Sequence, residues 1–171
     1  MTYTDTLKDA FEAIKFQESG VTQLRSNSDG VMHAVYTMLI AGALATLFTI
    51  NPVVWLTGAI AALVGGSVGI AVIHLFAVLL GGQASFQDYF AVIGNAYMVN
   101  WATVIPFLAP FVGLYYLVLN GWVLTKVHKL SVGRAVFAIL LPAIIVIVIF
   151  GVFAFLFGSL VLGGLLSMAQ F

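Results

Sequence analysis

The sequence contains no cysteine and very little charge. Of its 171 residues, 7% are charged, in equal numbers of each sign, and 63% are hydrophobic. The absence of cysteine excludes disulfides, thiolate metal sites and a cysteine nucleophile. A soluble domain has roughly 25% charged residues, and a large core cannot explain this deficit because a water-exposed surface must be polar. The composition therefore predicts an integral membrane protein. The formal net charge of zero gives no sign of nucleic-acid binding.

Five apolar segments are candidates for membrane crossing, which takes about 20 apolar residues per helix. They are residues 31–50, 53–80, 86–105, 111–125 and 135–157. Beyond them we expect an interfacial tail broken at Gly163-Gly164, although a second span in this last stretch stays open. The predicted fold class is all-α, an integral membrane bundle of five transmembrane helices with a short N-terminal amphipathic helix. Residues 1–30 would form a cytosolic segment and residues 31–171 the membrane domain.

The basic residues orient this bundle. They fall in two groups, one before the first span and one after the fourth: Lys8, Lys15 and Arg25, then Lys126, Lys129 and Arg134. Four crossings separate the groups, so both lie on one side, and positive residues stay on the cytosolic side during insertion. We expect a multi-pass protein, most simply of a prokaryotic cell membrane, with a cytosolic N-terminus and the C-terminus outside or lumenal. The simplest interpretation of the basic loop is a topology signal.

Residues 4–16 have the spacing of an amphipathic helix. Leu7, Ala10, Phe11 and Ile14 follow the i, i+3, i+4, i+7 pattern. Such a helix would pack under its own bundle, lie in the membrane interface or offer an apolar stripe to a partner. The residues that follow, up to Gly30, are polar and indicate a linker.

Few residues could carry chemistry. No metalloprotease, nucleophile-elbow, phosphate-loop or dinucleotide motif is present, and no two of the three histidines have the spacing of a helical metal site. Asp88 is the one acid between Val31 and Phe171, and it lies three residues after Ser85, which is typical of a helix N-cap. Alternatively, Asp88 and His74 would form a polar pair at the same end of the bundle. We expect no metal, no cofactor and no enzymatic activity.

A small-residue face runs along the second predicted span. Gly65 and Gly69 are separated by three residues, a spacing that lets a neighbouring helix approach closely. The same face would serve packing within the bundle or self-association.

Two stretches resemble the Yip family, membrane proteins that interact with Ypt/Rab GTPases, and its prokaryotic relatives. The first, "HLFAVLLGGQASFQDYFAVIGNAY", is similar in its helix end, helix start and Gly-x-x-Tyr, carried by Gly81, Gly82, Ser85, Phe86, Gly94 and Tyr97. The second, "GWVLTKVHKLSVGRAVFAILLP", is similar to the family's cytosolic hairpin at Trp122, His128, Leu130, Ser131, Arg134, Ala135 and Pro142. The sequence departs from the family in having no proline soon after Tyr97 and no glycine around Lys129. The resemblance implies a role on the cytosolic face in organising membrane traffic, and the short N-terminal segment is closer to prokaryotic relatives.

These observations favour a non-enzymatic protein that binds or scaffolds other membrane proteins, or copies of itself, within the lipid bilayer. The expected contacts lie in the basic loop and on the amphipathic helix: Lys126, His128, Lys129, Arg134, Leu7, Phe11 and Ile14. The alternative is a small transporter or channel, with His74 and Asp88 gating protons. A membrane enzyme acting on lipid is the third and weakest hypothesis.

Overall fold

The computed structural model describes the backbone of residues 1–168, and side chains except at 150, 154–156 and 158–168. Within this part every regular element is helical, as the sequence predicts. There are seven α-helices within these residues: α1 Tyr3–Ile14, α2 Glu18–Ser26, α3 Gly30–Ala45, α4 Pro52–Leu79, α5 Phe86–Ala96, α6 Ala109–Val127 and α7 Val132–Met168. The 3₁₀ helices are η1 Leu47–Thr49, η2 Tyr97–Val104 and η3 Pro106–Leu108.

The chain divides into two compact units, which we describe separately. The first, Met1–Ile139, holds helices α1 to α6 and the start of α7. The second, Leu140–Phe171, contains the rest of α7, one continuous helix as far as Met168 with Pro142 inside it. The predicted break at Gly163-Gly164 is therefore wrong.

Three helices are long and apolar enough to cross a membrane in the part of the chain that the structure describes, rather than the five that we predicted. They comprise Pro52–Leu79, Pro106–Val127 and Val132–Phe153. The first predicted span is shorter than expected, because α3 has 16 residues and gives way to η1. The third predicted span is not one α-helix, since α5 continues as the 3₁₀ helix η2.

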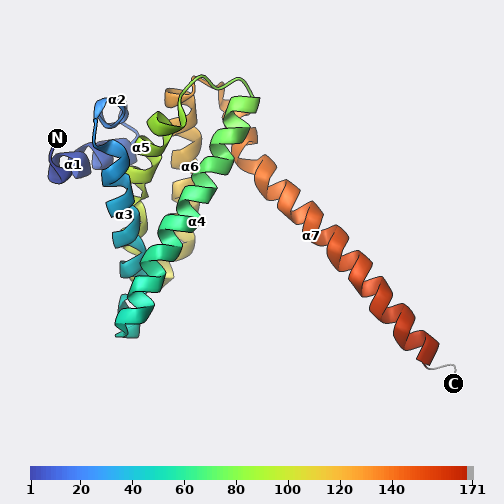
Figure 1. The fold of residues 1–171 in the computed structure, drawn as a ribbon. Coiled ribbons are helices and arrows are strands. Elements are labelled where there is room, and N and C mark those ends of the chain that lie inside the picture. Colours follow the sequence, from blue (N-terminus) through green and yellow to red (C-terminus); the bar gives the residue numbers. More distant parts are fainter. Residues whose placement is uncertain (169–171) are drawn as a thin grey trace. The chain divides into compact units, whose positions relative to one another are not determined.

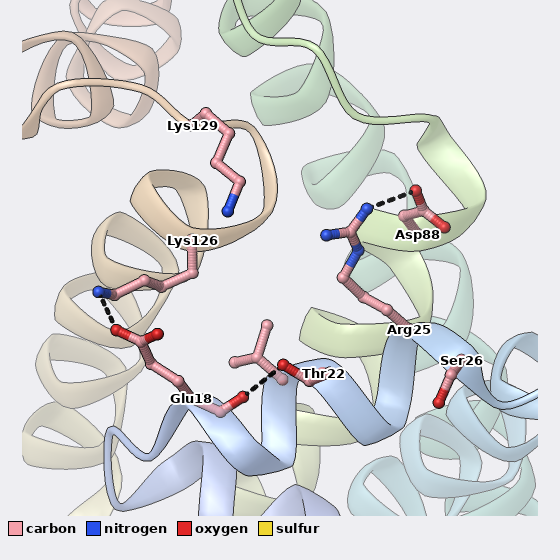
Figure 2. A pocket seen from close by; sticks show the side chains of 8 residues that line it. Glu18, Thr22, Arg25, Ser26, Asp88, Lys126 and Lys129 are labelled. Carbon is pink, nitrogen blue, oxygen red and sulfur yellow. Dashed lines mark hydrogen bonds and ion pairs between the residues drawn. The ribbon is translucent and has the colours of Figure 1, made fainter.

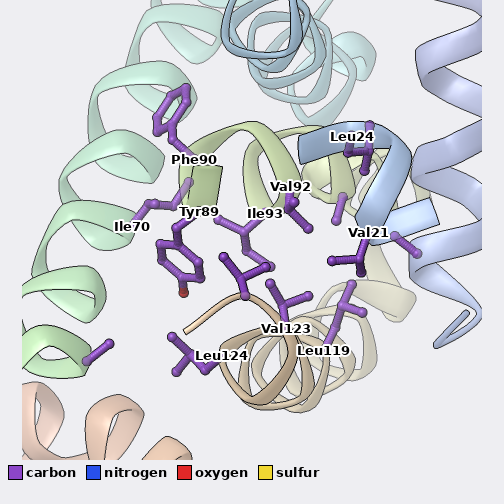
Figure 3. Close-up of a cluster of buried hydrophobic side chains, with 14 of the residues drawn as sticks. Val21, Leu24, Ile70, Tyr89, Phe90, Val92, Ile93, Leu119, Val123 and Leu124 are labelled. Carbon is purple, nitrogen blue, oxygen red and sulfur yellow. The ribbon is translucent and has the colours of Figure 1, made fainter. Parts of the chain in front are cut away.

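The short helix α5 forms the centre of the first unit (Figures 1 and 3). It contacts α1, α2, α3, α4 and α6, and every residue from Tyr89 to Ala96 is buried. Tyr89 and Ile93 are fully buried and lie in one apolar cluster with Leu119, Val123 and Leu124 of α6 (Figure 3). Apolar residues all round a helix require burial on all sides, which explains the central position of α5.

The close crossing of α3 and α4 depends on two glycines. A Cβ atom on Gly42 would lie 2.2 Å from the Gly58 carbonyl oxygen, and one on Gly58 would lie 2.7 Å from the Gly42 carbonyl oxygen. By contrast, a Cβ atom on Gly65 or Gly69 would meet nothing within 4 Å. The predicted Gly65–Gly69 face therefore does not pack against a helix within the described residues.

The amphipathic helix is confirmed, as α1, and it packs onto its own bundle. Thr6 on its buried side shares a hydrogen bond with the His33 ring at 2.7 Å, and the Tyr3 hydroxyl shares one with Thr37 at 3.1 Å. Phe11, however, remains 54% exposed.

The predicted linker is wrong, because residues 18–26 form the helix α2. Val21 and Leu24 are buried one turn apart, and Gly20 lies so close to α1 that a Cβ there would be 2.3 Å from the Asp9 carbonyl oxygen. Glu18 in the first turn and Arg25 in the last turn suit the helix dipole.

Candidate functional site

Two ion pairs fasten α2 to the end of the bundle at which α4 ends, α5 begins and α6 ends. The Lys126 ammonium donates to the Glu18 carboxylate. The Arg25 guanidinium donates to the Asp88 carboxylate at 3.1 Å. These partners lie 108 and 63 residues apart in the sequence, and the pairs bring Arg25 of the first basic group close to Lys126 and Lys129 of the second.

A pocket of about 320 Å³ opens between these charged side chains (Figure 2). We call it the polar pocket, and its lining residues are Glu18, Val21, Thr22, Arg25, Ser26, Asp88, Lys126 and Lys129. Figure 2 shows the Lys129 side chain reaching from the loop after α6 toward the space between Lys126 and Arg25. The lining therefore carries three cations and two carboxylates.

The polar pocket contains more positive than negative side chains. Lys126 lowers the pKa of the Glu18 carboxyl, first through its hydrogen bond and then through its charge, so Glu18 is ionised at neutral pH. Each carboxylate has one cation, whereas Lys129 forms no ion pair within the described residues. The pocket consequently keeps an excess positive charge.

Lys129 has a backbone conformation that favours glycine. Its φ angle is +58°, in the left-handed region where a side chain clashes with the backbone. A lysine here means that the pocket gains a cation at the expense of backbone strain.

A buried polar layer lies behind the loop that carries Lys129. The rings of His74 and His128 share a hydrogen bond at 3.2 Å, and the Tyr89 hydroxyl donates to the Asn120 side chain at 2.6 Å. His128 is fully buried, and its Nδ1 atom has no hydrogen-bond partner in the described part of the chain. Burial lowers the pKa of His128 to about 4, with further lowering by His74 and Arg25 and an opposing effect of Asp88.

The structure separates the predicted polar pair. His74 bonds to His128, and Asp88 bonds to Arg25, so no hydrogen bond or ion pair joins His74 to Asp88 in the described chain. The N-cap interpretation is confirmed, because the Ser85 hydroxyl accepts from the Asp88 backbone N–H at 3.1 Å.

Some of the predicted contact residues are accessible in the structure, and others are buried. Lys126 and Lys129 line the polar pocket, but His128 is fully buried and therefore has no surface to offer a partner. The Arg134 guanidinium lies beside Gly81, 3.3 Å from where a Cβ on that glycine would be. On α1, Phe11 is exposed and Leu7 and Ile14 are partly exposed, while the Ile14 carbonyl accepts from the Tyr115 hydroxyl.

Several residues that carry the Yip resemblance have identifiable structural roles. Gly81 has a φ angle of +95° at the end of α4, and a Cβ on Gly82 would lie 2.6 Å from the His128 ring. A Cβ on Gly94 would lie 2.7 Å from Ala34 of α3. The Phe86 ring packs against the His74 ring, and Tyr97 is the C-cap of α5. Ala135 is buried.

A second cavity, of about 250 Å³, lies among α4, η2 and α6. Its lining residues are Gly65, Gly66, Gly69, Ile70, Ile73, Tyr97, Asn100, Tyr116 and Asn120. The open glycine face of α4 thus borders a space that also contains amide and phenol groups. We call it the central cavity.

Reasoning from the sequence does not identify Glu18, Thr22 and Ser26, because their polar segment predicts a linker, and it identifies Arg25 only as a charge that orients the bundle. The signal was present in the buried spacing of Val21 and Leu24 and in the terminal charges of α2. Within residues 1–168, no group of three or more His, Cys, Asp or Glu side chains could hold a metal ion. Comparison with protein-family models, curated protein sequences and solved structures gives no match.

Proposed function

We propose that this chain is a non-enzymatic integral membrane protein that binds and organises other membrane proteins, in a Yip-like manner. The observation that carries the proposal is the composite surface at the polar pocket. Segments from α2, α5 and the end of α6 join there, at the end of a bundle whose long helices suit a membrane by length and composition. Recognition at such a surface would be electrostatic, which favours specificity and fast association.

Exposed apolar side chains support insertion in the membrane. Along α4 they recur on one face, at Leu56, Ile60, Val64 and Val68, each about half or more exposed. Spacing of four residues keeps them on a single stripe of the helix. Lipid is the natural environment for such a stripe, because monomeric soluble proteins rarely expose large contiguous apolar patches.

Five crossings remain our proposal for the topology, with two of them irregular. At about 1.5 Å per α-helical and about 2.0 Å per 3₁₀ residue, α5 and η2 together extend roughly 32 Å. By the same rises, α3 and η1 together extend roughly 30 Å. Both values approach the roughly 30 Å thickness of the hydrocarbon. The buried position of α5 also shields its polar groups from lipid.

The test is photo-crosslinking in intact membranes with a reactive residue at Gln23, which is exposed on α2 beside the polar pocket. The matched control carries the reactive residue at Val64, on the lipid-facing stripe of α4. A partner captured from Gln23 but not from Val64 supports the proposal. Reversing the charge at Lys126, Lys129 and Arg134 should abolish that product, provided that insertion stays normal. An undiminished product would leave the basic loop as a topology determinant only.

The central cavity favours a second candidate function, a small transporter or channel. Asn120 and Tyr116 contribute polar groups between helices that would lie in the membrane. Purified protein in proteoliposomes should then carry an ion or proton flux above that of empty vesicles, reduced by Asn120→Leu. A flux equal to that of empty vesicles at every pH would exclude this candidate.

A further inference from the structure

The starting point is the cation at Lys129, which has a left-handed backbone and, among the residues that the structure describes, no ion-paired carboxylate. Its φ angle of +58° carries strain that glycine would avoid. The same conformation occurs at Phe16, which like Lys129 follows the C-cap of a helix, where a left-handed residue is common, so the charge is what distinguishes Lys129. Lys129 is exposed, and its side chain enters the polar pocket (Figure 2).

The other two cations keep donors available even while they are ion-paired. Arg25 uses one guanidinium nitrogen for Asp88, and Lys126 uses its ammonium for Glu18. A guanidinium has five N–H donors and an ammonium three. An additional anion in the pocket could therefore accept from all three cations without displacing either carboxylate.

Aromatic residues indicate the depth of the pocket in the membrane. The ring of Phe16 packs edge-on against Tyr115 at 5.7 Å and Trp122 at 5.4 Å. Trp122 precedes Lys126 by one turn of α6, whereas Tyr115 lies about three turns before it, so the Trp122 end of this cluster is the part nearest the polar pocket. Trp and Tyr are enriched at the level of the lipid headgroups, and the pocket is then within reach of those headgroups.

From these observations we propose that the polar pocket binds a phosphate group, that of an anionic phospholipid headgroup, through Lys129, Arg25 and Lys126. Three cations from three separate segments surround a concave site, which suits a tetrahedral oxyanion better than a planar carboxylate. Arg and Lys are the usual phosphate ligands in proteins. The Thr22 and Ser26 hydroxyls line the same pocket but donate to the backbone carbonyls of Glu18 and Gln23, so the three cations are the donors for the anion.

The inference goes beyond the scaffold proposal and needs only that the polar end lies at the membrane surface. The test uses the full-length chain in detergent micelles. Native mass spectrometry and a Trp fluorescence titration would follow short-chain phosphatidylglycerol, short-chain phosphatidylcholine, inorganic phosphate and a Glu-rich peptide.

Two variants give the comparison. Lys129→Gly removes the pocket cation and suits the backbone at that position. Lys8→Gln removes one cation from the exposed side of α1, away from the pocket. Each variant is first checked for an unchanged or higher melting temperature.

We expect saturable phosphatidylglycerol binding that weakens about tenfold in Lys129→Gly, in line with one lost charge-assisted hydrogen bond, and less than twofold in Lys8→Gln. Phosphatidylcholine should bind more weakly, because its headgroup is zwitterionic and the choline cation is repelled by the positive pocket. If inorganic phosphate displaces phosphatidylglycerol at a similar concentration, the pocket binds phosphate, but a lipid headgroup is not its particular ligand. The proposal would be overturned if both variants lost the same phosphatidylglycerol affinity or if phosphatidylglycerol binding did not saturate. Binding of the Glu-rich peptide without binding of the lipid would overturn it as well. Lipid binding without a crosslinked partner would overturn only the scaffold function.

Discussion

Lys129 combines three properties that are seldom found in one residue: a left-handed backbone, an exposed charge and no ion pair within the described chain. Each property by itself is common in surface loops. The left-handed backbone ends α6 as it ends α1 at Phe16, so the ammonium group in the polar pocket is the property that distinguishes Lys129.

The strain at Lys129 predicts a stability change that depends on the backbone and not on the charge. Lys129→Gly should raise the free energy of unfolding by about 0.5–1 kcal/mol, because the left-handed conformation costs glycine nothing. Lys129→Ala removes the same charge but keeps the Cβ clash, so its stability should stay near that of the natural chain. Thermal melting in one detergent would measure both. Equal stability of the two variants would mean that the backbone at this position is unstrained.

His128 makes a prediction about pH. Its pKa is near 6.5 in an unfolded chain and about 4 in the folded protein, so the unfolded state binds more protons between these values. Stability should therefore be full above pH 6.5, fall as the pH drops toward 4, and change no further through this group below that. The difference in melting temperature between the natural chain and His128→Gln, measured across pH 4 to 7, isolates the effect. A difference that is constant with pH would contradict it.

Among the elements, the glycines of α3 and α4 contribute to helix packing to very different extents. Gly42 and Gly58 meet at the helix crossing, whereas the sequence drew attention to Gly65 and Gly69, which face open space. Spacing identifies faces that permit close approach, but only the tertiary arrangement decides which of them is used.

This difference predicts opposite effects for two matched substitutions in neighbouring helices. Gly42→Ala should destabilise the protein by about 1–3 kcal/mol, because the new Cβ overlaps backbone of α4 and the helices must separate. Gly65→Ala should be neutral or stabilising by about 0.5–1 kcal/mol, since alanine suits a helix better than glycine. Unfolding in graded mixtures of mild and denaturing detergent would compare them. A large loss from Gly65→Ala would show that something packs against this face.

The elements also show where prediction from the sequence succeeds. The bounds of α4, the amphipathic α1 and the Ser85 cap follow from hydropathy, periodicity and local hydrogen bonding, all of which are local signals. The change of α5 into η2 and the helical α2 were missed. Hydropathy does not distinguish an α-helix from a 3₁₀ helix, and the polar surface of α2 concealed the spacing of its two buried side chains.

For the whole molecule, the polar pocket could be predicted only in part. Charge counting predicts that the two basic groups lie on the same side of the membrane, and in the structure Arg25 of the first group and Lys126 and Lys129 of the second line one pocket. The partners themselves depend on tertiary contacts across 63 and 108 residues. That is why the alternative pair of Asp88 with His74 is wrong and Asp88 pairs with Arg25 instead, while His128, which we expected at the surface, is buried.

The central claim is a membrane bundle with the N-terminal helices and the basic loop on the cytosolic side. Because the natural sequence has no cysteine, single cysteines at the exposed positions Gln23, Ser131 and Thr49 can be labelled in intact cells with a membrane-impermeant maleimide. The account predicts labelling of Thr49→Cys at once, and of Gln23→Cys and Ser131→Cys only after the membrane is permeabilised. Labelling of Gln23→Cys and Ser131→Cys from opposite sides of the membrane would contradict it.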